Sequence, residues 1–304
     1  MLDRAEDFIG RVTFVTGPEK HCGKTTFMNR AAGIARRGAL ASARPGPALL
    51  TAGYDGESRD FLSGARKPAV PVCAGDLVLT TERFARPCLP EIIDVLPGQT
   101  ALGRLCIARA RRDSVVALVG PDGNSQIAWA IDRIVTGGLT DTVLVDGAIN
   151  RITQVASLPG GRFVYVLRVD RSTLRQAVGR VRRIGLLTSL PVADDGAAQG
   201  DSLRGEPQAF WLDDALTTET AARLPAAARL VVVDDMTKVF LGESELLAFV
   251  RERALQVRRC LTFGGFVVSC RGLANEEFLA ALDDKRLADM VAFNPYEPAR
   301  ELVA

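Results

Sequence analysis

The sequence of 304 residues has a single histidine, His21, and its six cysteines form no Cys-x-x-Cys pair. One histidine cannot build a multi-histidine metal centre or the usual Ser-His-Asp triad. Cysteines scattered along a chain of this length are also a poor match to a disulfide framework or a zinc site. The sequence therefore argues against these chemistries and predicts reduced thiols, as in a cytoplasmic protein.

Net charge and long apolar runs are lacking as well. Lysine and arginine together number 38, against 36 for aspartate and glutamate, so no global field would draw the protein onto nucleic acid or an anionic membrane. Charges interrupt every apolar stretch before it reaches the roughly 20 residues of a membrane-spanning helix. The first residues, MLDRAED, do not resemble a secretory signal. We therefore expect a cytoplasmic protein that binds neither nucleic acid nor membranes.

Short runs rich in Val, Ile, Leu and Phe alternate with segments of helical period. This pattern is typical of an α/β protein with a mainly parallel sheet. The best defined helix follows Gly23, buries Phe27, Ala31, Ile34 and Ala35 on one face, and is expected to end at Gly38. Strands are expected at 11–15, 47–52, 142–145, 163–169, 230–233, 266–269 and 290–293.

Two segments depart from this pattern and indicate how the chain is divided. Between residues 54 and 114 the helical period is lost, and short strands at 69–73, 77–80 and 105–108 indicate a β-rich insertion. Residues 192–208 are rich in Gly, Ala and Asp, as linkers are. We therefore expect one domain over 1–191, including the insertion, and a C-terminal α/β domain over 209–304.

Residues 12–29 read VTFVTGPEKHCGKTTFMN: an apolar strand, a turn, Gly-Lys-Thr, then an amphipathic helix. This order is typical of P-loop NTPases, whose backbone N–H groups converge on phosphates at a helix N-terminus. Lys24 would reach the terminal phosphates, and Thr25 would supply a hydroxyl to Mg²⁺. ATP with Mg²⁺ is the expected cofactor. The expected nucleotide contacts in the loop are Gly17, Pro18, Glu19, Lys20, His21, Cys22, Gly23, Lys24, Thr25 and Thr26.

The loop is one residue longer than usual, because five residues rather than four separate Gly17 from Gly23. Pro18 would still turn the chain, but it donates no backbone N–H. The sequence thus predicts nucleotide binding and leaves open whether the protein is an ATPase that also hydrolyses the nucleotide. Guanine specificity has no support, since the chain has no Asn/Thr-Lys-x-Asp motif.

A magnesium-side acid is expected at the end of a second strand. The stretch TVLVDG supplies Asp146, and Gly147 could present its N–H to the terminal phosphate. Asp234, in LVVVDD, has the same local pattern beyond the linker and is the competing acid. Asp55, in GYDGESRD, could contact Mg²⁺ through water or belong to a solvated turn.

Arginines gather in two places in the sequence. Either they form solvated helix and loop faces or they form a surface for a partner or a phosphate, and both alternatives are open. The two groups are Arg109, Arg111 and Arg112, and Arg171, Arg175, Arg180, Arg182 and Arg183.

Five further stretches follow one another along the chain: TAGYDGESRD, KPAVPVCAGDLVLTT, ALVGPDGNSQ, VLVDGAINR and VVVDDMTKVF. Together they resemble the B subunit of the lysine 5,6-aminomutase reactivase. The resemblance implies a companion reactivase subunit similar to mismatch-repair ATPases, and an adenosylcobalamin-dependent aminomutase as client. It draws attention to the matching residues Asp55, Gly56, Asp146, Gly147 and Arg151.

Three functions are therefore open. The first is the nucleotide-binding subunit of a reactivase or chaperone-like system, as the resemblance implies. The second is a P-loop small-molecule ligase or kinase, because TVLVDGA also suits P-loop enzymes of the biotin-synthesis type. The third is a nucleotide-free scaffold that has kept the loop as structure.

Overall fold

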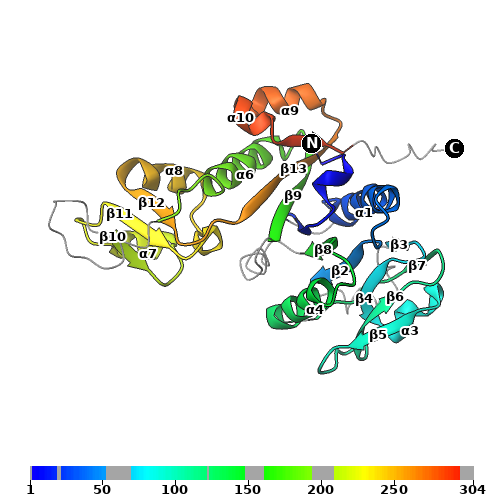
Figure 1. Cartoon of the computed structure of the whole chain (residues 1–304). Coiled ribbons are helices and arrows are strands. Elements are labelled where there is room, and N and C mark those ends of the chain that lie inside the picture. The colour runs from blue at the N-terminus through cyan, green and yellow to red at the C-terminus, as the bar shows by residue number, and fades with distance from the viewer. Residues whose placement is uncertain are drawn as a thin grey trace. The chain divides into compact units, whose positions relative to one another are not determined.

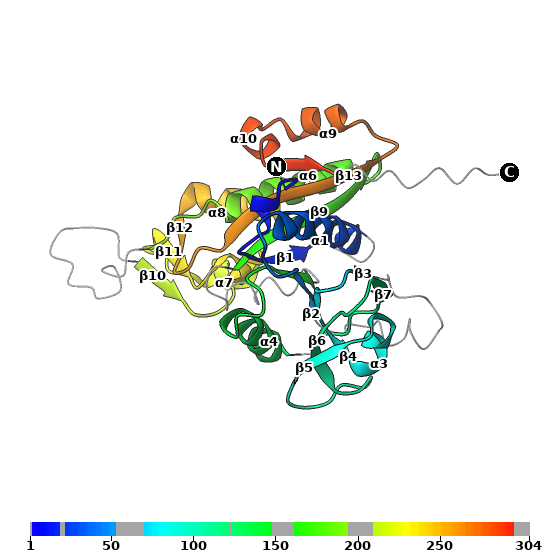
Figure 2. The same cartoon turned by 45° about the vertical axis from the view of Figure 1, so that its right-hand side comes forward.

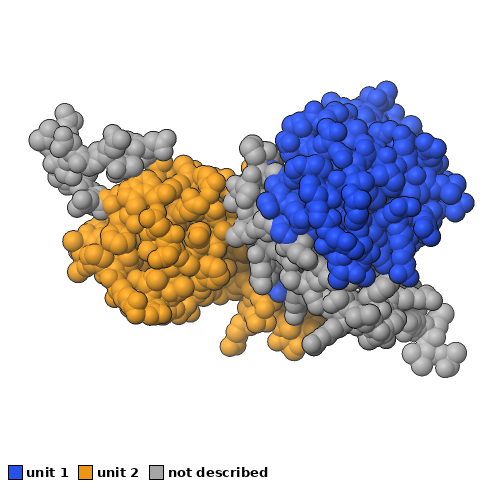
Figure 3. Space-filling model, turned by 90° about the horizontal axis from the view of Figure 1, so that it is seen from below, with its two compact units in different colours: residues 1–168, 264–269, 291–304 blue, residues 169–263, 270–290 orange. Residues whose placement is uncertain are grey.

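The computed structural model describes residues 2–18, 22–52, 70–121, 123–147, 161–193 and 209–294. It is a mixed α/β protein with a large, mostly parallel central sheet, as the sequence predicts (Figure 1). Its contacts divide the chain into two compact units, coloured separately in Figure 3. Unit 1 comprises residues 1–168, 264–269 and 291–304, and unit 2 comprises residues 169–263 and 270–290.

The central sheet has nine strands in the order β14-β13-β9-β1-β8-β2-β4-β6-β5. Strand β1 lies between β8 and β9 and is parallel to both. Its neighbours are almost continuously buried, as expected for parallel strands covered on both faces. All seven strands expected from the sequence are present. Six are β1 (Val12–Thr16), β2 (Ala48–Ala52), β8 (Val143–Gly147), β9 (Gly161–Asp170), β13 (Thr262–Arg271) and β14 (Val291–Phe293).

The β-rich segment expected at 54–114 is present over its described part, but it continues the central sheet. Strand β4 (Leu77–Thr81) is parallel to β2, and β6 (Leu105–Arg109) and β5 (Glu91–Val95) follow it in antiparallel pairs. A separate antiparallel pair joins β3 (Val70–Val72) to β7 (Ser114–Val116). Two short helical turns, α3 (Glu82–Ala85) and η2 (Arg86–Cys88), connect β4 to β5.

Helix α1 (Lys24–Ala41) packs on β1, as Figure 2 shows, and also contacts β8. It buries the apolar face predicted from the sequence. The expected end at Gly38 is wrong, because the helix continues to Ala41. A side chain at Gly38 would overlap Ala5 and come within 2.6 Å of Ile9 Cδ1. Gly38 therefore allows the turn η1 (Ala5–Asp7) to pack closely against the C-terminal part of α1.

Helix α4 (Asn124–Thr136) packs near β2 in unit 1. Unit 2 contains a three-stranded parallel sheet in the order β10-β11-β12, in which β11 is the strand expected at 230–233. Its elements are α6 (Leu174–Leu187), β10 (Ala209–Leu212), α7 (Thr218–Arg223), β11 (Leu230–Val233), η5 (Met236–Lys238), α8 (Glu243–Glu252), β12 (Ala254–Val257), α9 (Asn275–Leu282) and α10 (Lys285–Ala288).

The boundary between the units differs from the one expected at 192–208. Helix α6 was expected in the first domain, yet it packs on α8, α9 and α10 and belongs to unit 2. The chain also returns to unit 1 through residues 264–269 of β13 and through β14. The division is set by the packing of α6 and by the pairing of β13 and β14 with the central sheet. Neither of these long-range contacts can be recognised from the amino-acid composition of a segment. None of the helices in the described part of the chain combines the length and apolar character needed to span a bilayer.

Candidate functional site

The candidate phosphate loop, residues 17–26, joins the end of β1 to the start of α1. Strand β8 lies beside β1 in parallel, with Val15 opposite Asp146. The carboxyl ends of both strands therefore meet at the same edge of the sheet. Open α/β sheets bind their ligands at this edge.

Thr25 and Asp146 are in direct contact. Thr25 Oγ1, in the first turn of α1, donates a hydrogen bond to Asp146 Oδ2 at 2.7 Å. On the other side of β8, Thr51 Oγ1 of β2 donates to the backbone carbonyl of Asp146 at 3.3 Å. The structure thus brings together the hydroxyl and the carboxylate that the sequence assigned to Mg²⁺, although 121 residues separate them. Both are oxygen ligands of the kind that Mg²⁺ prefers.

The two glycines of the motif are required for different physical reasons. A Cβ at Gly17 would lie 2.6 Å from Cys22 Sγ and 2.6 Å from the carbonyl oxygen of Val166 in β9. Only glycine therefore lets the chain leave β1 between these groups. Gly23 has a φ of 102°, in the left-handed region, immediately before the first residue of α1.

The remaining described residues of the loop lie around this turn. Lys24 Nζ is 3.6 Å from Cys22 Sγ, and both groups are in the loop. Cys22 is buried, so its side chain packs beneath the loop. Pro18 is partly exposed and Thr26 is exposed.

Several residues singled out from the sequence lie outside the described residues: Glu19, Lys20, His21, Asp55, Gly56 and Arg151. Gly147 is described and ends β8, opposite Ala52 of β2. Among the described residues, the one atom near a Cβ at Gly147 would be Ala52 Cβ, at the ordinary distance of 3.8 Å. The role of Gly147 toward a phosphate stays a prediction.

The sequence did not single out Thr16 or Thr51. Thr16 is buried, and its Oγ1 donates to the carbonyl of Val164 at 3.0 Å, which ties the end of β1 to β9. Both threonines hold strand ends at the loop. Thr16 is the last residue of the strand before the motif, and this position was the available signal in the sequence. The signal is weak because threonine is common in strands.

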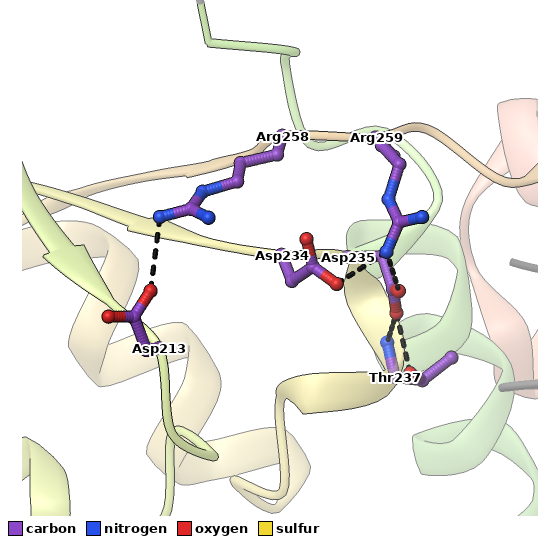
Figure 4. A network of polar contacts seen from close by, with 6 residues as sticks. All are labelled: Asp213, Asp234, Asp235, Thr237, Arg258 and Arg259. Atoms are coloured by element: carbon purple, nitrogen blue, oxygen red, sulfur yellow. Dashed lines mark hydrogen bonds and ion pairs between the residues drawn. The ribbon is translucent and has the colours of Figure 1, made fainter. Parts of the chain in front are cut away.

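The competing acid, Asp234, belongs to a different network, which lies in unit 2 (Figure 4). It follows β11, and its Oδ2 accepts a hydrogen bond from Arg259 Nη2. Asp235 beside it is buried and accepts from the backbone N–H of Thr237 at 2.8 Å and from the hydroxyl of the same residue. At the ends of the flanking strands, Arg258 Nη2 pairs with Asp213 Oδ1 at 3.1 Å.

This unit 2 network also lies at the carboxyl ends of three parallel strands, but its charges are paired internally. The guanidinium of Arg258 additionally lies over the ring of Trp211, 4.8 Å from its centre. The acids of this network thus have partners within unit 2, at the ends of its strands. The sequence signal was the recurrence of charged pairs after three apolar runs, at Asp213, Asp234 and Arg258.

The arginines of the two sequence clusters mostly hold the fold together. Arg182 donates to the carbonyl of Leu282 and Arg183 to the carbonyls of Val239 and Leu241. Arg171 pairs with Glu277 at 3.1 Å. Arg109 and Arg111 lie 3.9 and 3.7 Å from Glu91, and Arg112 donates to the carbonyl of Pro87. Arg182 is exposed and Arg183 is partly buried, and both also donate to backbone carbonyls of segments that pack beside α6.

Among the described residues no group of three or more His, Cys, Asp or Glu side chains could hold a metal ion. A magnesium–nucleotide site does not need one, since phosphate oxygens and water supply most of its ligands. Comparisons with protein-family models, curated proteins and solved structures gave no match to this chain.

Proposed function

We propose that this protein is a P-loop NTPase-like protein that binds ATP as its Mg²⁺ complex on residues 17–26. The observation that supports the proposal is the 2.7 Å hydrogen bond between Thr25 Oγ1 and Asp146 Oδ2. It joins the hydroxyl after the motif lysine to an acid at the end of the neighbouring parallel strand. That pairing is the arrangement in which P-loop proteins hold their metal.

Each residue has a distinct part in this proposal. The backbone of the loop and the start of α1 would present N–H groups to the phosphates, whose negative charge the helix dipole favours. Lys24 would offset the charge of the terminal phosphates. Thr25 would ligate Mg²⁺, and Asp146 would hold the metal on its far side, directly or through water. No general base is assigned, so the proposal is binding, with hydrolysis left to measurement.

Titration calorimetry with ATP and Mg²⁺ tests the proposal. Wild type should bind saturably, and EDTA should weaken that binding. Lys24→Ala should lose a charge-assisted contact of about 1.5–3 kcal/mol, or roughly tenfold or more in affinity. The control Arg37→Ala removes an exposed positive charge from the same helix and should bind as wild type does. Equal affinity of Lys24→Ala and wild type would mean that ATP binds away from Lys24 and would contradict the proposed site. No binding by wild type would leave the scaffold interpretation.

For the cellular role, we propose a reactivase or chaperone-like system in the cytoplasm, on the resemblance alone. Its partners would be a companion ATPase subunit and an adenosylcobalamin-dependent aminomutase client. Purification of the tagged full-length chain from its own cells, with and without ATP, should recover both. Recovery of neither, together with ATP-dependent conversion of a small metabolite by the purified chain, would favour the ligase or kinase alternative.

A further inference from the structure

Unit 1 contains a cavity of about 380 Å³ that the proposed nucleotide site does not use. It lies between the turns α3 and η2 on one side and the strands β5 and β6 with their connection on the other. Small-molecule sites begin at about 300 Å³, so the cavity has room for a compact ligand. Its position is at the end of β4, whereas the candidate phosphate loop is at the end of β1, three strands away in the sheet.

One wall of the cavity is apolar and exposed. Ile92 and Val95 of β5 are 40% and 37% exposed, and Leu102 comes from the connection between β5 and β6. Cys106 adds its side chain, and its Sγ donates to the carbonyl of Thr80 at 3.3 Å. Burial raises the pKa of this thiol to about 11, so it is neutral near pH 7 and adds apolar surface without charge.

The rim of the cavity is positively charged. Arg83, Arg86 and Arg104 line it, against the single carboxylate of Glu82. Nearby, Arg109 and Arg111 share Glu91, but among the described residues no acid lies within ion-pair distance of the three lining arginines. Arg83 does contact a ring, with its guanidinium 5.8 Å from the centre of Phe84. Guanidinium groups on a concave apolar wall are suited to a carboxylate or a phosphate.

A buried hydroxyl in the cavity wall is left without a partner. Thr81 is 2% exposed, and its Oγ1 has no hydrogen-bond partner within the described ranges. Thr81 is the N-cap residue of α3, where a threonine usually caps the helix, yet its side chain makes no capping bond. The preceding Thr80, in contrast, donates to the carbonyl of Ala117 at 2.7 Å. A buried hydroxyl without a partner is unfavourable, but this oxygen is enclosed and is not open to a ligand in the cavity.

We propose that this cavity binds a small organic anion, a carboxylate or phosphate monoester with a compact apolar body. The apolar body packs on Ile92, Val95 and Leu102, and the arginines pair with the anionic group. The site stands independently of the proposed nucleotide function.

Fluorine NMR of the full-length protein tests the cavity with two matched probes. The probes are 4-(trifluoromethyl)benzoate and its neutral amide, 4-(trifluoromethyl)benzamide. Wild type should bind the benzoate saturably and the benzamide at least roughly tenfold more weakly, because only the benzoate pairs with the arginines. Equal binding of the two probes, or no saturable binding of the benzoate, would overturn the proposal. This comparison uses wild type alone and does not depend on whether a variant folds.

Variants of the lining residues then test whether the benzoate binds in the cavity. Arg86→Gln/Arg104→Gln should weaken benzoate binding at least roughly tenfold, because the two lining guanidinium groups that pair with the carboxylate are lost. The control Arg4→Gln removes an exposed positive charge far from the cavity lining and should bind as wild type does. Unchanged benzoate affinity in a double variant that melts as wild type does would refute the site. Displacement of the benzoate by ATP and Mg²⁺ would assign the cavity to the nucleotide and also refute the proposal.

Discussion

At the scale of single residues, Asp76 carries a charge in the interior of unit 1. It is 1% exposed and follows β3, where its Oδ2 accepts from the backbone N–H of Cys73 at 2.7 Å. Arg36 of α1 pairs with the same oxygen through Nη2 at 2.7 Å and through Nε at 2.8 Å. Burial raises the pKa of Asp76, and the Arg36 guanidinium opposes that rise. The Arg36–Asp76 ion pair therefore links α1 to the turn before β4.

The stability of Arg36→Met should depend on pH. A raised pKa means that the folded state holds the proton of Asp76 more tightly, so the contribution of this group to stability falls as pH rises. Without Arg36 the pKa rises further, and at pH 7.5 a lone buried carboxylate should cost about 3–5 kcal/mol. The loss should shrink toward acid pH, where Asp76 is protonated. Urea unfolding at several pH values measures both effects.

Arg44→Met is the matched control for this prediction. Arg44 pairs with Asp141 at 2.7 Å, but both side chains are 48% exposed. An exposed pair contributes at most about 1 kcal/mol, so this variant should lose little stability at any pH. A loss in Arg36→Met that is the same at acid and neutral pH would mean that the packing of the arginine, and not the charge of Asp76, is responsible.

At the scale of elements, helix α1 shows that glycine can have a packing role within a helix. Glycine to alanine in a helix interior normally stabilises by about 0.5–1 kcal/mol. At Gly33 a Cβ would meet only Arg37 Nη1 at 3.7 Å, so Gly33→Ala should show this gain. At Gly38 the Cβ would overlap Ala5 of η1, so Gly38→Ala should destabilise by about 1–3 kcal/mol. Thermal unfolding of both variants should give shifts of opposite sign, and two stabilising shifts would contradict the close packing of η1.

The sequence predicts elements well where hydrophobic periodicity and burial coincide. Buried strands such as β1 and β8 consist almost wholly of apolar and small residues, so a short apolar run identifies them. Strand β5 was not predicted, because its sequence EIIDV is partly exposed at the edge of the sheet and contains a bulge. The predicted helix end at Gly38 is wrong for another reason. The contact that requires a glycine there comes from η1, which lies outside the helix.

At the scale of the whole molecule, strand order decides what the local motifs can do together. The sequence identifies the loop and proposes two strand-end acids, Asp146 and Asp234, with the same local pattern. It cannot choose between them, because the neighbour of β1 depends on how all strands of the sheet are arranged. The structure places β8 beside β1 and places Asp234 in unit 2 with Arg259 as its partner. The cavity at the end of β4 has no sequence motif, since its lining comes from a hairpin and two short turns.

The proposed magnesium site is tested most directly by the Mg²⁺ dependence of ATP binding in Asp146→Asn and Asp234→Asn. Both variants remove one carboxylate charge after a buried parallel strand, one in each unit. Calorimetric titration with ATP at increasing Mg²⁺ should show at least a roughly tenfold loss of Mg²⁺-dependent affinity for Asp146→Asn. Asp234→Asn should bind as wild type does, since its lost ion pair with Arg259 is partly exposed and contributes little to stability. Greater loss in Asp234→Asn, or no loss in a folded Asp146→Asn, would contradict the assignment of the site to β1, α1 and β8.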